Sequence, residues 1–412
     1  MGRVVSLAGT IVATRLLAPE LFGQLSAVLL VAATFASVAT LGLGVAVTKR
    51  VAEFRARDPE RVGGLARLAL KMVLISGVTA TAALILGRHW MAGTWLHSPA
   101  LATEVGLASV LVLTSSLFAV EIGILTGFEA FSGAAVANSI RSILSALLLV
   151  CGIEIAGVNG AILGTVLGEA VAVAWAAVTI SKFHVPGGDP VFGRVGVLPG
   201  TWKPLLRLGM PALGAGIALS LSLLIGQRIL AGQPDGFVAV AQFNVAYRWS
   251  LVILFIPAAL SPVMTPLLAN LAGANAHVSF RRLVRANFVI LCLVTVLPAL
   301  VMIIARQFVL GLSGSDYQSD TLAFVILIAG TLPVALNTLL SQTALALDAI
   351  FAWFISDVVL ALALVASAVA LAPRYLAAGL ASAYVIGYLA TCTALAVPVW
   401  IRVRGLGADL SS

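Results

Sequence analysis

The 412-residue sequence is far more apolar than that of a soluble domain, with 61% hydrophobic residues, 10% charged residues and a mean hydropathy of +1.11. Soluble domains have about 25% charged residues, and a chain this apolar has too little polar surface to cover itself in water. The composition therefore excludes a soluble enzyme and indicates a polytopic membrane protein. At roughly 20 apolar residues for each helical span, it suffices for about 12 transmembrane helices.

The net charge of +8 arises from 24 Lys and Arg against 16 Asp and Glu. Inner loops of membrane proteins collect Lys and Arg, so this excess predicts membrane topology and no nucleic-acid partner. The three cysteines and four histidines are scattered along the sequence. We therefore expect no metal site and no cofactor.

Twelve apolar stretches predict an all-α polytopic membrane protein. The first six spans are predicted at residues 4–18, 22–47, 68–86, 105–126, 134–155 and 160–180. The second six are predicted at residues 208–230, 237–271, 283–304, 322–347, 350–371 and 376–401. The first span is about 15 residues, or roughly 22 Å of helix, against a bilayer core of about 30 Å, which leaves open whether Met1 is the true start.

A long polar segment at residues 181–207 divides the chain into two sets of six spans. We predict an N-terminal six-helix lobe over residues 1–182, a cytoplasmic linker over 183–203 and a C-terminal six-helix lobe over 204–412. If both termini are cytoplasmic, 18 of the 24 Lys and Arg lie on the inner side, which is the bias toward the cytoplasmic side that membrane proteins show. The remaining six are Arg15, Arg88, Arg228, Arg248, Arg306 and Arg374.

Short motifs recur in the same order in both halves. Arg15-Leu16-Leu17-Ala18 reappears as Arg228-Ile229-Leu230-Ala231, 213 residues later. The segments that begin at Leu107 and Val158 match segments 215 and 219 residues further on. Because each half has an even number of spans, the matches predict two lobes related by a parallel pseudo-two-fold repeat, with substrate bound between them.

Three segments carry a resemblance to a known family. They are ATRLLAPELFGQLSAVLLVAATFASVATLGLGVAVTKRVAEF (residues 13–54), LLRLGMPALGAGIALSLSLLIGQRILAG (205–232) and VAQFNVAYRWSLVILFIPAALSPVMTPLLANLAG (240–273). The sequence resembles the Wzx-type polysaccharide flippases, the O-antigen and teichoic-acid transporters of the MOP superfamily, along nearly its whole length. The family's seventh helix commonly ends in Asp-Arg, and this chain has Gln227-Arg228 instead.

The resemblance implies a flippase that moves a lipid-linked oligosaccharide or polysaccharide repeat unit across the bacterial inner membrane by alternating access. The resemblance implies a transporter and not an enzyme. Its expected partners are the lipid-linked glycan, membrane lipids and a coupling cation, either a proton or sodium. An anionic head group in a cavity needs fixed cations, and arginine suits phosphate oxygens. We therefore expect Arg15, Arg228 and Arg248 to bind the head group; the alternative for Arg15 and Arg228 is snorkelling to the membrane interface.

Four further charged residues lie within the predicted spans, where they are costly and often functional. Glu121 and Arg141 fall at similar depths in neighbouring spans, so we expect them to pair. Asp357 holds a position in span eleven close to that of Arg141 in span five, and Glu169 lies near the middle of span six. These residues are candidates for ion coupling, and the competing interpretation is a structural salt bridge.

Pro257, Pro262 and Pro266 predict a bend in span eight beside Arg248, either a hinge or a fixed kink. Two other functions stay open. A MATE-like cation-coupled exporter would favour carboxylates and aromatic residues in its cavity. A membrane-embedded glycan polymerase or glycosyltransferase would be expected to have a long outer loop or a DxD-like acidic motif, and this sequence has neither.

Overall fold

The computed structural model describes residues 2–57, 60–183, 202–274, 276–318, 321–347 and 349–405. Within these ranges the regular elements are all helices, which confirms the predicted all-α class. The chain forms two compact units, Met1–Leu224 (unit 1) and Ile225–Ser412 (unit 2), and each is described by itself. Most of the predicted linker, 183–203, lies outside the described residues, so the division predicted at that linker stays a prediction.

In the part of unit 1 that the structure describes there are ten helical elements and most of an eleventh, α9. They are α1 (Gly2–Leu16), α2 (Pro19–Ala39), α3 (Leu43–Arg57), α4 (Glu60–Leu86), α5 (Arg88–Trp90), the π-helical turn η1 (Met91–Trp95), the 3-10 turn η2 (Pro99–Leu101), α6 (Ala102–Ala108), α7 (Val110–Gly127), α8 (Phe131–Ser181) and α9 (Trp202–Ala231). Helix α7 is central, because it packs against α2, α3, α4 and α8.

Unit 2 begins within α9 and continues through eight further elements. They are α10 (Gly236–Ile253), α11 (Phe255–Gly273), α12 (His277–Ile304), α13 (Arg306–Ser313), the 3-10 turn η3 (Ser315–Tyr317), α14 (Leu322–Ala329), α15 (Thr331–Ala346) and α16 (Ile350–Gly405). Here α15 is central and packs against α11, α12 and α16.

Seven described helices are long and apolar enough to cross a membrane, and the bent pair α10–α11 makes an eighth. Two of the seven, α8 with 51 residues and α16 with 56, exceed by far the roughly 20 residues that one span needs. Each reverses at an internal break and supplies two spans. Together with the shorter α1 and the apolar end of α9, the described helices match the 12 predicted spans in number and order.

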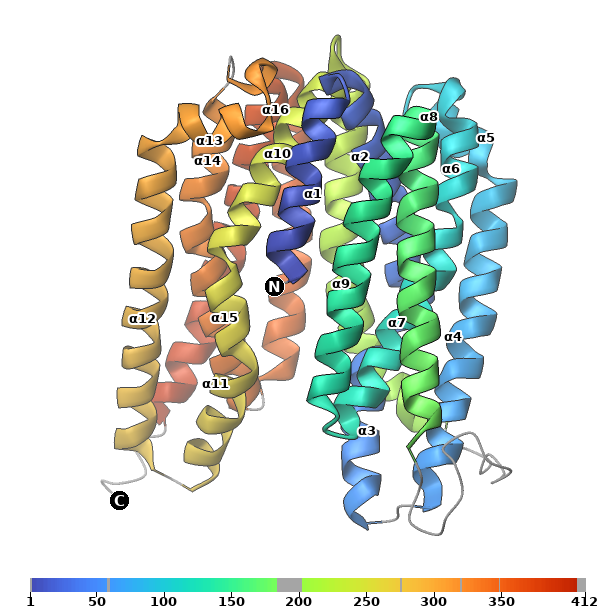
Figure 1. Ribbon diagram of the computed structural model, residues 1–412. Helices are drawn as coiled ribbons and strands as arrows, with labels where there is room; N and C mark the ends of the chain where they lie inside the picture. The colour runs from blue at the N-terminus through green and yellow to red at the C-terminus, as the bar shows by residue number, and fades with distance from the viewer. Residues whose placement is uncertain are drawn as a thin grey trace. The chain divides into compact units, whose positions relative to one another are not determined.

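Helix α8 is a hairpin that turns at Ala156 and Gly157, and its two arms stand side by side (Figure 1). Gly157 has φ 56° and ψ −132°, a conformation that glycine adopts with little strain. Next to the turn, the backbones of Gly152 and Gly160 touch: a Cβ on Gly160 would lie 2.7 Å from the carbonyl carbon of Gly152. Small residues let membrane helices approach this closely.

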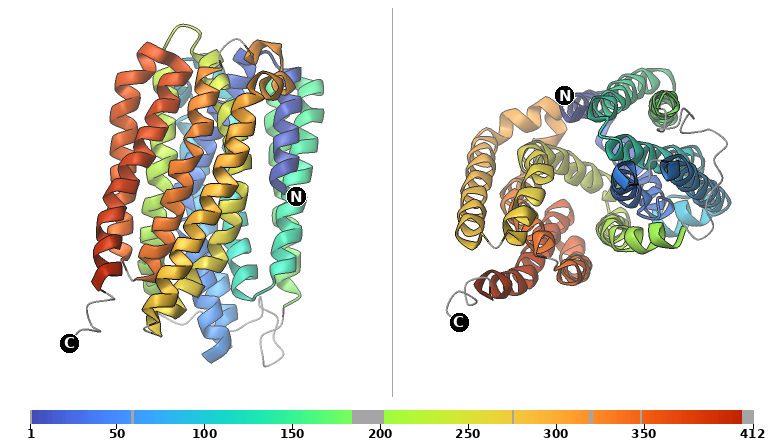
Figure 2. Two further views of the ribbon diagram at one scale, coloured as in Figure 1. Left: turned by 90° about the vertical axis from the view of Figure 1, so that its left-hand side faces the viewer. Right: turned by 90° about the horizontal axis from the view of Figure 1, so that it is seen from below.

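Helix α16 forms a corresponding hairpin (Figure 2), which turns at Leu376 with φ 47° and ψ −125°. Gly379 meets Leu371 beside the turn, as Gly160 meets Gly152 in α8, and Gly387 meets Leu364 as Gly168 meets Ser145. Each of these positions in α16 lies 219 residues after its counterpart in α8. The two hairpins therefore share these two close contacts and the position of the turn. The repeat of whole six-helix lobes extends this correspondence and stays a prediction.

The predicted second span, 22–47, differs from the structure. Helix α2 ends at Ala39, and α3 begins at Leu43 after a turn in which Leu41 and Gly42 have φ values of 52° and 64°. An apolar sequence pattern continues through this turn, so hydropathy alone could not reveal it. The predicted bend in span eight is confirmed: the α10–α11 pair bends by 51° at Leu254, just before Pro257.

Candidate functional site

The charged centre of unit 1 is a carboxylate held by a guanidinium and two hydroxyl groups. Glu169 on the second arm of α8 is paired with Arg141 on the first arm, with 3.0 Å between Arg141 Nε and Glu169 Oε1. The Ser115 hydroxyl on α7 donates to Glu169 at 2.9 Å, and the Thr114 hydroxyl donates to it at 3.4 Å. The Glu169 side chain is 4% exposed and that of Arg141 is 43% exposed.

Backbone geometry explains why these groups meet. Gly168 lies against the Ser145 backbone, where an added Cβ would be 2.6 Å from the Ser145 Cα. The next residue, Glu169, therefore lies close to the first arm, about one helical turn from Arg141. Phe118 of α7 supports the guanidinium, whose carbon lies 4.9 Å from the ring centroid. The arrangement combines a charge-assisted hydrogen bond with a cation–π contact.

The structure corrects the predicted pairing of Glu121 with Arg141, because the ion pair of Arg141 is formed with Glu169. The prediction rested on the similar depths of Glu121 and Arg141 within their spans. Depth alone does not determine which residue of a neighbouring helix faces Arg141. Residues equidistant from a hairpin turn face each other. Arg141 lies 16 residues before Gly157 and Glu169 lies 12 residues after it, so they differ by about one helical turn, which the long arginine side chain spans. The position of the predicted loop between spans five and six therefore indicates which residues of these two spans face each other, and it could have indicated this pair.

Glu121 occupies a different environment. Its side chain is buried at 3% exposure, and its Oε2 has no hydrogen-bond partner among the described residues. Its neighbours on α7, Phe118, Ile124 and Leu125, belong to the apolar core of unit 1. Burying a carboxylate oxygen without a hydrogen-bond partner is costly. Glu121 is therefore a second acid, separate from the Glu169 centre, that is suited to carrying a proton.

The corresponding centre of unit 2 is aromatic. Tyr247 on α10 packs edge-on against Tyr384 on α16, with ring centroids 5.7 Å apart, and Tyr384 packs against Tyr388 at 4.9 Å. Phe243 stacks on Tyr247 from one turn earlier at 6.0 Å. Sequence reasoning did not single out this cluster, although the spacing of Tyr384 and Tyr388 by four residues places both on one helix face.

Asp357 lies on the first arm of α16, half-buried and within electrostatic range of Tyr388. The matched hairpin contacts align Asp357 with Asn138 of α8, and they align Arg141 with Leu360 and Glu169 with Tyr388. Asp357 thus stands one turn away from the position equivalent to Arg141. This carboxylate and the tyrosine cluster are the features of unit 2 most suited to holding a cation.

The three predicted head-group arginines belong to different units. Arg15 is exposed in the last turn of α1 in unit 1, and Arg228 is half-buried near the end of α9 in unit 2. Arg248 is exposed on α10, directly after Tyr247 and two turns before the bend at Leu254. Arg248 thus lies next in sequence to Tyr247 of the tyrosine cluster, and the predicted convergence of Arg15 with Arg228 stays a prediction.

The described residues contain no cluster of three or more His, Cys, Asp or Glu side chains that could hold a metal ion. The polar groups in the two centres are suited to binding ions or protons and to positioning charged ligands.

The profile of the family described as "Polysaccharide biosynthesis protein" matches residues 1–272. Comparison with curated proteins finds no match. Among solved structures, an inward-facing multidrug resistance MATE family transporter of the MOP superfamily is similar at a TM-score of 0.85, with 19% identity over 99% of this chain and 96% of that chain.

Two other solved structures extend the likeness. A MOP superfamily transporter from Pyrococcus furiosus, described as having a binding pocket of reverse polarity, has a TM-score of 0.69 and 18% identity over 98% of this chain and 96% of that chain. The lipid II flippase MurJ in an inward closed conformation has a TM-score of 0.77 and 13% identity over 99% of this chain and 88% of that chain. At these identities the likeness establishes the fold. The chain belongs to the polysaccharide biosynthesis protein family and has the MOP superfamily fold of membrane transporters and flippases.

Proposed function

We propose that this protein is a flippase that translocates a lipid-linked oligosaccharide or polysaccharide repeat unit across the bacterial inner membrane by alternating access. The observation that carries the proposal is the family match, which covers the first 272 residues of a chain whose fold is also that of a lipid II flippase. Both termini would be cytoplasmic, as the distribution of Lys and Arg favours.

In this function the arginines hold the anionic head group. Arg15, Arg228 and Arg248 supply guanidinium groups that remain charged and match phosphate oxygens. The exposure of Arg248 supports its role, because a cation within a span that is open to ligand can replace part of the hydration of a phosphate. No covalent step is required of the protein.

Ion coupling is assigned to the carboxylates. Protonation of Glu169 would release the Arg141 guanidinium, since their ion pair requires a carboxylate. Glu121 and Asp357 are further acids at which a proton or sodium ion could act. Acidic residues in both units, Glu121 and Glu169 in unit 1 and Asp357 in unit 2, would allow ion binding to favour one conformation over another.

The test is transport of a fluorescent lipid-linked oligosaccharide in proteoliposomes, read by accessibility to a membrane-impermeant lectin. Wild-type protein should expose the glycan, whereas Arg15→Ala and Arg248→Ala should slow exposure by about tenfold, or 1.4 kcal/mol. Arg306→Ala serves as the matched control, because Arg306 is an exposed arginine at the start of α13, outside the predicted spans. Unchanged transport by Arg15→Ala and Arg248→Ala at normal protein levels would refute the head-group assignment.

A MATE-like cation-coupled exporter is the second candidate. The tyrosine cluster beside Asp357 favours it, because aromatic faces and a carboxylate are the groups that bind organic cations. Binding of tetraphenylphosphonium to the purified protein, abolished by Asp357→Asn, together with absence of glycan translocation, would establish the exporter in place of the flippase.

A further inference from the structure

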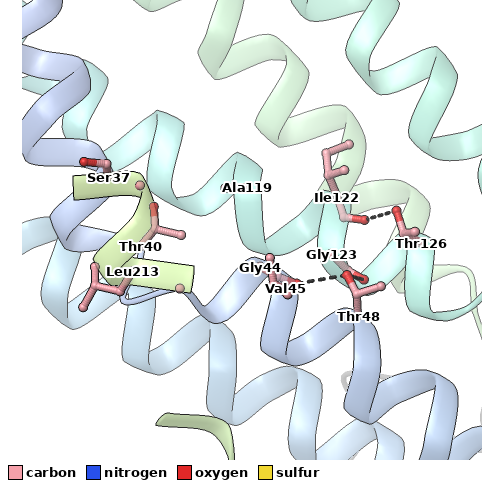
Figure 3. A pocket seen from close by; sticks show the side chains of 12 residues that line it. Ser37, Thr40, Gly44, Val45, Thr48, Ala119, Ile122, Gly123, Thr126 and Leu213 are labelled. Atoms are coloured by element: carbon pink, nitrogen blue, oxygen red, sulfur yellow. Dashed lines mark hydrogen bonds between the residues drawn. The ribbon is translucent and has the colours of Figure 1, made fainter. Parts of the chain in front are cut away.

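Unit 1 contains a cavity that the polar centres do not use. It has a volume of about 400 Å³ and opens where the turn between α2 and α3 meets α7 and α9 (Figure 3). Its twelve lining residues are Ser37, Thr40, Gly42, Gly44, Val45, Thr48, Ala119, Ile122, Gly123, Thr126, Leu213 and Gly216. Pockets for small ligands fall in the range of about 300–1,000 Å³, so the size is that of a binding site.

Glycines create this cavity by bringing backbones together while leaving space between them. A Cβ on Gly42 would lie 2.9 Å from the Cα of Gly209, and a Cβ on Gly123 would lie 3.1 Å from the Cα of Gly44. The close contacts fix α3 against α7 and α9. Gly216 differs, because a Cβ there would meet nothing within 4 Å. Its side-chain position is open to the cavity, and it can be filled without disturbing the helices.

The hydroxyl groups around the cavity donate their protons to backbone carbonyl oxygens. Thr40 donates to Ala36 O at 2.7 Å, Thr126 to Ile122 O at 2.7 Å, and Ser37 to Thr34 O at 2.8 Å. Thr48 donates to Gly44 O and Gly123 O, bonds that Figure 3 shows in part. The hydroxyl protons are thus engaged, and the twelve lining residues carry no charge. The wall is therefore mainly hydrocarbon, as Val45, Ile122 and Leu213 also indicate.

A cation lies one helical turn beyond this wall. Lys49 follows Val45 by four residues on α3, so the two side chains share a face about 6 Å apart along the helix. Both are exposed, Val45 at 64%. Two neighbouring arginines are occupied: Arg50 pairs with Glu53 at 2.9 Å, and Arg55 pairs with Glu129. Among the basic side chains of α3 that the structure describes, Lys49 is thus the one best placed to meet a ligand in the cavity.

We propose that this cavity binds one hydrocarbon chain of an anionic lipid, whose phosphate lies at Lys49. An apolar cavity at the end of a membrane span with a lysine one turn beyond it complements an amphiphile with an anionic head. The same chemistry fits a bilayer phospholipid and a polyprenyl phosphate. The site does not depend on the transport proposed above, because a lipid could occupy it in either candidate function.

The test is photolabelling in vesicles by two anionic probes, a phosphatidylglycerol with a diazirine in its acyl chain and a polyprenyl phosphate with the same group. Labelling of peptides that contain residues 37–48, 119–126 or 213–216 by either probe supports the site, and the stronger probe identifies the source. Labelling of none of these peptides by either probe overturns the proposal.

Gly216→Leu fills the cavity and should reduce labelling at these peptides by about tenfold. Gly273→Leu is the matched control, because Gly273 also has open space at its Cβ but lies at the end of α11 in unit 2. Val45→Phe is a second filling variant, since Val45 is exposed at the cavity wall and tolerates a larger side chain. Labelling that stays at the wild-type level in both Gly216→Leu and Val45→Phe overturns the proposal.

Lys49→Gln tests the head group. It should reduce labelling by the anionic probes and leave unchanged the labelling by a diacylglycerol carrying the same diazirine chain. An equal reduction for the charged and uncharged probes would show that Lys49 acts through structure and would overturn its assignment to the phosphate.

Discussion

The hairpins α8 and α16 have the same backbone plan but different chemistry at their centres. In α8, Arg141 and Glu169 form an ion pair across the arms. At the equivalent positions α16 has Leu360 and Tyr388, with Tyr388 in an aromatic cluster and Asp357 one turn away. One scaffold therefore holds an electrostatic centre in unit 1 and an aromatic centre in unit 2. The comparison indicates that glycine contacts and turn geometry define the hairpin. The residues midway along its arms can therefore differ between the two units without changing the backbone.

Arg141→Leu should give the largest loss of stability, because it places in unit 1 the residue that unit 2 has at this position. It leaves the buried Glu169 without its cation, and breaking such a pair costs about 3–5 kcal/mol. Arg141→Leu/Glu169→Gln should recover most of that loss, since no buried charge remains. The free energy of unfolding in mixed detergent micelles measures both. A double variant as unstable as the single one would show that the ion pair is not the stabilising contact.

Tyr384→Ala should have the next largest effect, in unit 2. It removes a buried ring that contacts both Tyr247 and Tyr388, and loss of a buried aromatic side chain costs about 3 kcal/mol. Tyr375→Ala is the control, because Tyr375 is 59% exposed on the same helix. Thermal unfolding of the purified protein gives the comparison, and equal melting temperatures for the two variants would contradict a packing role for the cluster.

Asp357→Asn should slow ion-coupled transport by about tenfold, or 1.4 kcal/mol, with little change in stability. The amide keeps the shape of the side chain and removes its charge. Asp316→Asn is the matched control, because Asp316 is an exposed aspartate in η3. Transport in proteoliposomes across a range of external pH values is the measurement, and an unchanged rate and pH profile would remove Asp357 from the coupling mechanism.

Gly157→Ala should cost about 1 kcal/mol, the smallest of these effects. Its Cβ would meet nothing within 4 Å, so the cost comes only from the positive φ of 56°. Leu376→Ala is the control in α16, because alanine and leucine both carry a Cβ at this positive φ. It should change stability only through the lost contacts of the leucine side chain. A Gly157→Ala protein that unfolds at the wild-type temperature would show that the α8 turn relaxes to another conformation.

The sequence by itself determined the membrane class, the 12 spans, the bend near Pro257 and the family. These follow from composition, hydropathy and motifs, which depend on residues close together in the chain. It also drew attention to Arg141, Glu169, Asp357 and Arg248 because charges in apolar stretches are rare.

Only the tertiary structure decided which of these residues meet. Arg141 pairs with Glu169 and not with Glu121, because the arms of α8 fold back at Gly157 and Gly168 lets them touch. The turn at Leu41 and Gly42 breaks the helix where the apolar sequence pattern continues. The cavity beside this turn is formed by residues of four helices. Contacts between distant segments depend on how closely two backbones approach and on the torsion angles of the turns that join them. A hydropathy pattern contains no information about either.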